Sequence, residues 1–217
     1  HLVKSLMDEG HEVVCADVKP THLWFQLFED NKNYSLDLKE YENCLTVSKG
    51  VDYIYNMACN MGGMGFIENN KAECMLSVLI NTNLLRAAVE NKCEKYLFSS
   101  SACVYNGSKQ NETFIPGLKE TDAYPAEPED GYGWEKLFSE RMCRHFTEDF
   151  GLETRVVRFH NIYGPVGTFD GGREKAPAAL CRKIIKAKSL NSKLIDVWGD
   201  GEQTRSFLYI DDCLEGM

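Results

Sequence analysis

The chain has 217 residues, of which 43% are hydrophobic and 26% charged, a balance that is ordinary for a soluble globular protein. A formal net charge of −9 argues against nucleic acid or an anionic membrane as the main partner, and no apolar run approaches the ~18 residues of a membrane span. The nine cysteines lack C-x-x-C spacing, so we expect free thiols in a reducing cytoplasm and no metal site.

The first stretch is typical of the second half of a dinucleotide-binding βαβ unit. A helix over 1–10 ends at a glycine, and a buried strand over 12–17 ends in an acid. In such units the acid accepts hydrogen bonds from a ribose, and a glycine fingerprint lies roughly 20 residues earlier. That position falls before His1, so we expect the sequence to be truncated there. An equally open interpretation is that Asp17 is only a polar residue of a turn.

A second acid and a glycine-rich loop follow. A short strand over 34–38 contains Asp37, which we expect to face the adenine. A helix over 39–48 and a continuous apolar strand over 52–58 then lead into the loop 59–66. Its glycines allow the backbone to approach a ligand closely. The same glycines also suit a plain flexible turn.

Hydroxyls and a thiol stand at the end of the next strand. A long helix is expected over 68–91 and a strand over 96–99. Four small residues follow that strand: Ser100, Ser101, Ala102 and Cys103. Since ligands of open α/β sheets bind outside the carboxyl ends of the strands, we interpret these residues as part of a site. The alternative for Cys103 is a small thiol buried in the core.

The strongest chemical signal is a tyrosine and a lysine four residues apart. A helix expected over 132–150 places Tyr132 and Lys136 on one face. A phenol titrates near pH ~10, and a neighbouring positive charge lowers its pKa. The pair is therefore a candidate acid/base for a sugar or alcohol hydroxyl. A second match to this spacing, Tyr105 to Lys109, spans a turn and is set aside.

The regular alternation changes after the next strand, expected over 153–158. A long polar loop over 159–175 precedes a helix over 176–188. We therefore predict an α/β fold with a Rossmann-type doubly wound parallel sheet and part of a smaller C-terminal substrate domain. The NAD-binding domain is assigned to 1–160, and a partial substrate-binding region, interleaved with it, to 161–217.

Two more strands are expected near the end of the sequence. The segments 194–198 and 204–210 flank Gly-Asp-Gly and favour a hairpin. Asp211 and Asp212 are expected to cap a helix that is cut off at the last residue.

Seven segments together carry a resemblance to a known family. They are 61–67 (MGGMGFI), 100–105 (SSACVY), 125–128 (PAEP), 132–136 (YGWEK), 158–165 (RFHNIYGP), 171–179 (GGREKAPAA) and 198–207 (WGDGEQTRSF). Nearly the whole chain resembles the extended short-chain dehydrogenase/reductase family of nucleotide-sugar enzymes. Within it, the likeness is greatest to members that convert GDP-mannose to GDP-L-galactose.

The resemblance implies a reaction and the residues that carry it. Tyr132, assisted by Lys136, is expected to take the proton of the C4 hydroxyl while C4 passes a hydride to NAD. Ser101 matches a serine that hydrogen-bonds the C4 oxygen. The resulting ketone acidifies the hydrogens on C3 and C5. Cys103 and Lys175 match the acid/base pair that epimerises these two carbons.

The resemblance also implies the binding residues. The NAD positions are Asp17, Asp37, Tyr132 and Lys136. The substrate positions are Gly62, Ser101, Ala102, Cys103, Asn161, Glu174, Lys175, Ala176, Lys183, Gln203, Thr204 and Arg205. The family further implies a homodimer and a role in the biosynthesis of ascorbate and cell-wall sugars.

Other interpretations stay open at this point. Lys175 taken alone fits a solvated loop lysine, and Arg205 fits a surface ion pair. The glycine fingerprint of the family is absent from the sequence. Another nucleotide-sugar 4-epimerase or dehydratase, or an inactive nucleotide-sugar-binding fragment, is the alternative function.

Overall fold

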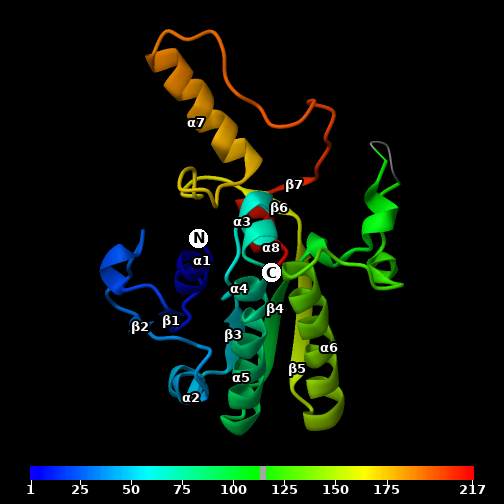
Figure 1. Ribbon diagram of the computed structural model, residues 1–217. Coiled ribbons are helices and arrows are strands. Elements are labelled where there is room, and N and C mark those ends of the chain that lie inside the picture. Colours follow the sequence, from blue (N-terminus) through cyan, green and yellow to red (C-terminus); the bar gives the residue numbers. More distant parts are fainter. Residues whose placement is uncertain (113–115) are drawn as a thin grey trace.

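The structure is a computed structural model that describes residues 1–112 and 116–217 (Figure 1). Its strands are β1 (Val14–Asp17), β2 (Lys32–Ser35), β3 (Tyr53–Asn56), β4 (Lys95–Ser101), β5 (Glu153–Phe159), β6 (Asn161–Tyr163) and β7 (Phe207–Tyr209). Its α-helices are α1 (Leu2–Asp8), α2 (Tyr41–Ser48), α3 (Met64–Asn69), α4 (Lys71–Met75), α5 (Ser77–Glu90), α6 (Tyr132–Phe150), α7 (Ala176–Ser189) and α8 (Ile210–Glu215). None of these described helices is long and apolar enough to cross a membrane.

The strands pair in parallel. β1 pairs with β2, β4 lies between β3 and β5, and β6 pairs with β7. The pairing of β4 with β5 runs from Lys95 opposite Glu153 to Ser101 opposite Phe159. Parallel strands bring their carboxyl ends to one edge, which places the end of β4 where ligands bind in α/β folds. The predicted α/β class with parallel strands is confirmed.

One layer of helices covers the central strands. α5 packs against α2 and against α6, and α5 and α6 lie alongside β3, β4 and β5 (Figure 1). α5 buries Leu84, Leu85 and Ala88 in the same cluster as Tyr96 and Phe98 of β4. Full burial of one large apolar side chain contributes about 1.5–3 kcal/mol, so this cluster holds β4 and the helices in a fixed relation.

The long helix expected over 68–91 is wrong in its extent. The structure divides the region into α3, α4 and α5. The first break lies at Asn70, whose φ of −133° and ψ of 43° leave the helical region. The Ser77 hydroxyl at the second break accepts a hydrogen bond from the Asn60 N–H at 2.9 Å. No glycine or proline lies between 68 and 77, and for that reason the sequence alone suggests one helix.

The hairpin near the end of the chain is also wrong. Residues 194–198 form no strand, and β7 instead pairs in parallel with β6. Leu194 and Trp198 are each 84% exposed, so the apolar alternation there has no sheet to pack on. The helix that follows begins at Ile210, which puts Asp211 and Asp212 in its first turn rather than at its cap.

Candidate active site

Tyr132 is the first residue of α6. Gly131 precedes it with a φ of 98°, a conformation that favours glycine. The Glu129 carboxylate accepts the Gly133 N–H at 2.9 Å and so satisfies one of the free donors of the helix N-terminus. The phenol of Tyr132 is buried and packs with Cys103 in one cluster.

Lys136 lies one turn further along the same helix face, as predicted. Its side chain is 1% exposed, and its Nζ lies 4.6 Å from the ring centroid of Phe98 and 5.5 Å from that of Tyr132. The carboxylate of Glu135 lies 3.9 Å away and is equally buried. A buried ammonium needs such a countercharge, because leaving water unpaired is costly for a charge.

A lowered pKa was expected for Tyr132, but in this structure the pKa is raised. Burial raises the pKa of Tyr132 well above its ordinary value, and the neighbouring thiol groups of Cys59 and Cys103 raise it further. A hydrogen bond with the Ser101 side chain acts in the opposite direction and lowers it. Desolvation of the phenolate is therefore the largest influence on the pKa of Tyr132.

Cys103 comes just after β4, in the 3₁₀ helix Ala102–Val104. Its N–H donates to the Ser101 hydroxyl at 3.2 Å, and its carbonyl accepts the Glu129 N–H at 3.0 Å. A Cβ placed on Gly133 would lie 2.5 Å from that carbonyl oxygen. The glycine thus allows α6 to touch the backbone of Cys103, which fixes the thiol relative to Tyr132.

The charge of Lys175 acts on Cys103. Burial raises the pKa of the thiol, and a hydrogen bond with Ser101 lowers it. The negative charge of Glu129 raises the pKa, whereas the positive charge of Lys175 lowers it. The charge of Lys175 therefore reaches the thiol of Cys103, although the two residues are far apart in the sequence.

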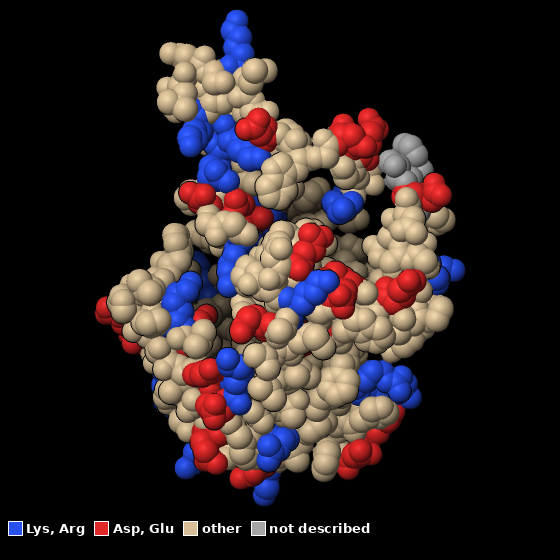
Figure 2. Space-filling view, viewed as in Figure 1, with Lys and Arg blue, Asp and Glu red and all other residues tan. Residues whose placement is uncertain are grey.

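Lys175 directly precedes α7, which has a proline in its first turn, a common way for a helix to begin. Figure 1 shows α7 projecting from the rest of the fold, and none of its residues is buried. Lysines and arginines gather along it on the visible face in Figure 2. This charge suits a diphosphate, which binds arginine and lysine.

The predicted substrate positions lie within this helix, in the segments on either side of it and nearer the sheet. Glu174 pairs with Arg182 at 2.9 Å, and Lys183 donates to the Asp196 carbonyl at 2.7 Å. Ala176 is the first residue of α7, while Ala102 and the buried Gly62 lie nearer the sheet. Asn161 begins β6 and donates to the Ser206 carbonyl at 3.1 Å. The exposed segment before β7 carries the remaining three: Gln203, Thr204 and Arg205.

The two acids expected to bind NAD follow neighbouring strands. Asp17 ends β1 and accepts the Lys19 N–H at 2.8 Å, while Asp37 lies two residues past β2 rather than inside a strand. A cavity of about 350 Å³ opens beside β1, with Asp17 and Trp24 in its wall. Both features suit the adenosine end of a dinucleotide at the carboxyl edge of the sheet.

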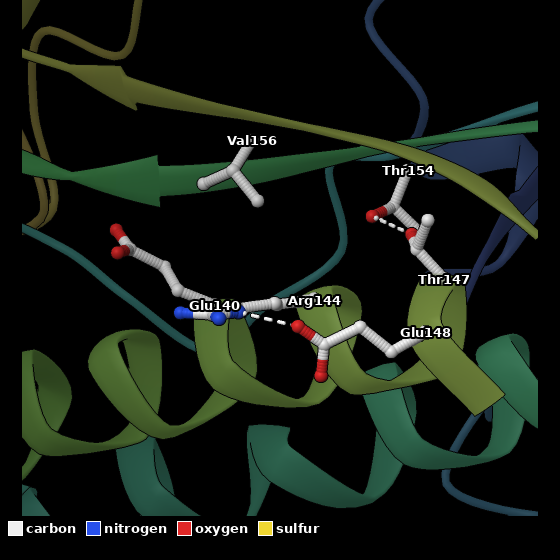
Figure 3. Close-up of a pocket in the computed structure, with 6 residues that line it drawn as sticks. All are labelled: Glu140, Arg144, Thr147, Glu148, Thr154 and Val156. Carbon is white, nitrogen blue, oxygen red and sulfur yellow. Dashed lines mark hydrogen bonds and ion pairs between the residues drawn. The ribbon is translucent and has the colours of Figure 1, made fainter.

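A second cavity, of about 360 Å³, has no predicted site residue in its wall (Figure 3). It lies between α6 and β5, where Arg144 pairs with Glu148 at 2.7 Å and Thr147 bonds Thr154 at 2.8 Å. Arg144, Glu148, Thr147 and Thr154 thus bond one another, and Glu140 bonds Arg158 and Ser100 outside the wall. Among the residues that the structure describes, no group of acids, histidines and cysteines is suited to a metal ion.

Three residues near the site were not singled out from the sequence. Glu129 and Cys59 act on the titration of Cys103 and Tyr132, respectively. Arg173 reaches from the segment before α7 to the loop after β3. Arg173 lies in the segment GGREKAPAA, two residues before Lys175. That proximity was the only feature of the sequence that could have pointed to Arg173.

Comparison with known proteins agrees with this geometry. The family model described as "NAD dependent epimerase/dehydratase family" matches residues 1–217. GDP-mannose 3,5-epimerase of Arabidopsis thaliana is 48% identical over 219 residues, covering all of this chain and 57% of that protein. GDP-mannose 3,5-epimerase 1 of Oryza sativa subsp. japonica is likewise 48% identical, with 56% of its length covered. The chain thus spans just over half the length of these relatives.

A solved structure has the same fold. The UDP-glucose 4-epimerase of Thermotoga maritima, determined with UDP-glucose, superposes with a TM-score of 0.86 at 21% identity. The match covers 99% of this chain and 67% of that one.

Proposed function

The chain belongs to the NAD dependent epimerase/dehydratase family, and on that premise we propose that the protein converts GDP-mannose to GDP-L-galactose by epimerisation at C3 and C5. The observation that carries the proposal is that Cys103 packs against Tyr132 and is acted on by the charge of Lys175, in a chain that is 48% identical to GDP-mannose 3,5-epimerases. One tyrosine suffices to oxidise an alcohol, whereas inverting two carbons needs further acids and bases.

The residues at the carboxyl ends of β1 and β2 fit NAD. Asp17 lies in the wall of the cavity beside β1, and a carboxylate there suits a free ribose and repels a 2′-phosphate. Asp37 lies past the neighbouring strand, on the side proposed for the adenine. Bound there, NAD would supply the hydride acceptor for the oxidation at C4 and the hydride donor for its reversal.

The first step is assigned to Tyr132, Lys136 and Ser101. The phenolate of Tyr132 takes the proton of the C4 hydroxyl, and the Ser101 hydroxyl holds the same oxygen. Since burial raises the pKa of Tyr132, formation of the phenolate depends on positive charge nearby, and Lys136 is proposed to supply it from 5.5 Å above the ring.

The second step is assigned to Cys103 and Lys175. A ketone at C4 acidifies the hydrogens on both neighbouring carbons. One group removes such a hydrogen as a proton from one face of the ring, and the other returns a proton on the opposite face. Burial raises the pKa of the Cys103 thiol, and the ammonium of Lys175 acts in the opposite direction, favouring the thiolate that removes such a proton.

The polar residues around α7 are assigned to the nucleotide. Lys183 and Arg205 are proposed to hold the diphosphate, and the nearby Gln203 and Thr204 to orient it. Gly62, Ala102, Asn161, Glu174 and Ala176 are proposed to line the sugar.

Deuterium incorporation tests the reaction. The natural full-length protein is incubated with GDP-mannose in deuterated water, and the recovered nucleotide sugars are examined by proton NMR. We expect deuterium at both C3 and C5, because both hydrogens pass through exchangeable groups. Exchange at neither carbon by protein with NAD bound would leave a simple 4-epimerase as the better function.

We also propose that the protein is a cytoplasmic homodimer that serves ascorbate and cell-wall sugar synthesis. The described cysteines are all free, as a reducing compartment allows. Trp134 and Phe138 of α6 and Leu79 of α5 are 44%, 55% and 41% exposed, so the helix layer has apolar side chains to offer a second copy. Sedimentation velocity of the full-length protein gives its oligomeric state, and a monomer at all concentrations would contradict the dimer.

A further inference from the structure

Arg173 joins two loops that are distant in the sequence. Its Nη1 donates to the Asn60 side-chain oxygen at 3.1 Å and to the Met61 carbonyl at 2.9 Å. Its guanidinium carbon lies 3.9 Å from the ring centroid of Phe66, a stacking distance for a cation over an aromatic ring. The three partners belong to the glycine-rich loop after β3 and to the helix that follows it.

This contact matters because packing alone does not place Lys175. The helix after Lys175 buries none of its residues, so it is not held by a core. Within the described part of the chain, Arg173 makes the only side-chain hydrogen bonds between residues 171–189 and residues 1–112. The position of Lys175 therefore depends on the attachment two residues before it.

The backbones of the two loops also touch. A Cβ on Gly63 would lie 2.9 Å from the Glu174 carbonyl oxygen, too close for any side chain. A Cβ on Gly62 would lie 2.7 Å from the Cβ of Phe66, so the loop folds back tightly on that ring. The arginine thus binds a loop whose shape is already restricted, next to the residue that precedes Lys175.

We propose that Arg173 is a positioning residue that holds Lys175 opposite Cys103 by fixing the segment before α7 to the loop after β3. The inference rests on the proposed function, because it assigns to Lys175 one of the two proton transfers. Arg173 itself touches neither Tyr132 nor Lys136. Its loss should therefore impair epimerisation while leaving the oxidation at C4 in place.

The test uses Arg173→Met in the full-length protein. This substitution removes the hydrogen-bond donors of the guanidinium and keeps an unbranched side chain that can pack against Phe66. A displacement of about 1 Å costs on the order of 100-fold in rate, so we expect that loss in deuterium exchange at one of the two carbons. Reduction of bound NAD by GDP-mannose should persist, because the oxidation at C4 does not use Lys175. Arg86→Met is the matched control: Arg86 also stacks on a ring, 4.0 Å from the centroid of Tyr41, away from the site.

A second readout needs no substrate. The pH midpoint for alkylation of Cys103, followed by peptide mass spectrometry, should rise in Arg173→Met, since the charge of Lys175 lowers the pKa of that thiol. Glu129, Ser101 and Tyr132 also face the thiol, and the substitution leaves them unchanged. Recovery of exchange by added guanidinium in Arg173→Ala would show that the fold is intact.

The outcomes separate the two proposals. Loss of exchange together with a raised midpoint supports the positioning role. Unchanged exchange and midpoint, as in Arg86→Met, overturn it, and so does lost exchange with an unchanged midpoint. If the wild type itself shows no exchange but the midpoint still rises in Arg173→Met, the proposed function fails and the role of Arg173 in placing Lys175 stands.

Discussion

Replacing Arg158 by methionine should destabilise the fold far more than the same change elsewhere on β5. The guanidinium of Arg158 forms two parallel bonds with Glu140, at 2.9 Å from Nε and 2.7 Å from Nη2. It also donates to the Glu120 carbonyl at 2.7 Å. The two charged side chains are 16% and 11% exposed, so water screens their attraction only weakly.

The size of the effect follows from what remains after the change. Glu140 would keep the Ser100 hydroxyl as a donor at 2.5 Å but would lose its countercharge. Removing one partner of a buried ion pair costs about 3–5 kcal/mol, because the other charge stays buried. In a chain of this size 1 kcal/mol shifts the midpoint of thermal unfolding by about 2–4 °C, so we expect a fall of about 6–20 °C.

Arg155→Met provides the control for this measurement. Arg155 lies on the same strand and pairs with Glu153 at 2.7 Å, but the two side chains are 67% and 44% exposed. Exposed pairs contribute about 0–1 kcal/mol, which predicts a fall of no more than about 4 °C. Circular dichroism on heating compares the two variants. Equal falls would refute the reasoning, and so would a failure of Glu140→Leu to restore stability to Arg158→Met.

Two further predictions concern the ligands. Cys103→Ser should leave GDP-mannose affinity unchanged by calorimetry but slow epimerisation by about 100-fold or more, because a hydroxyl is a far weaker acid than a thiol; unchanged turnover would make Cys103 only a packing residue. Asp17→Asn should weaken NAD binding by roughly 10–100-fold, the worth of a lost charged hydrogen bond. Retained affinity would identify Asp17 as the turn residue that its bond to Lys19 also suggests.

The catalytic helix could be predicted closely because its signals are local. The sequence placed it over 132–150, and the structure ends it at Phe150 with Gly151 in the left-handed conformation, φ 73°. The face shared by Tyr132 and Lys136 follows from helix geometry alone. The position of Cys103 at the end of β4 was likewise predictable, since parallel strands share a ligand-binding edge.

Features that depend on distant neighbours could not be predicted in the same way. The pKa of Tyr132 depends on how deeply the phenol is buried, and the spacing to Lys136 carries no information on that burial. The apolar alternation over 194–198 indicates a strand only where a sheet is available to pair with it, and here β7 takes that place beside β6. The break at Asn70 is marked by no glycine or proline in the sequence.

The residues of the candidate site are therefore held in place in two ways: some by packing, and one by hydrogen bonds. Tyr132 and Lys136 are fixed by α6 and by the buried cluster around Phe98, so changing their neighbours also costs stability. Lys175 stands before a helix without buried residues, where the bonds of Arg173 replace packing. In the proposed reaction, substitutions around Lys175 should consequently alter which carbons are epimerised while the fold and the oxidation at C4 survive. The role proposed for Tyr132 rests on a packed helix, whereas the role proposed for Lys175 rests on the part of the site that packing holds least.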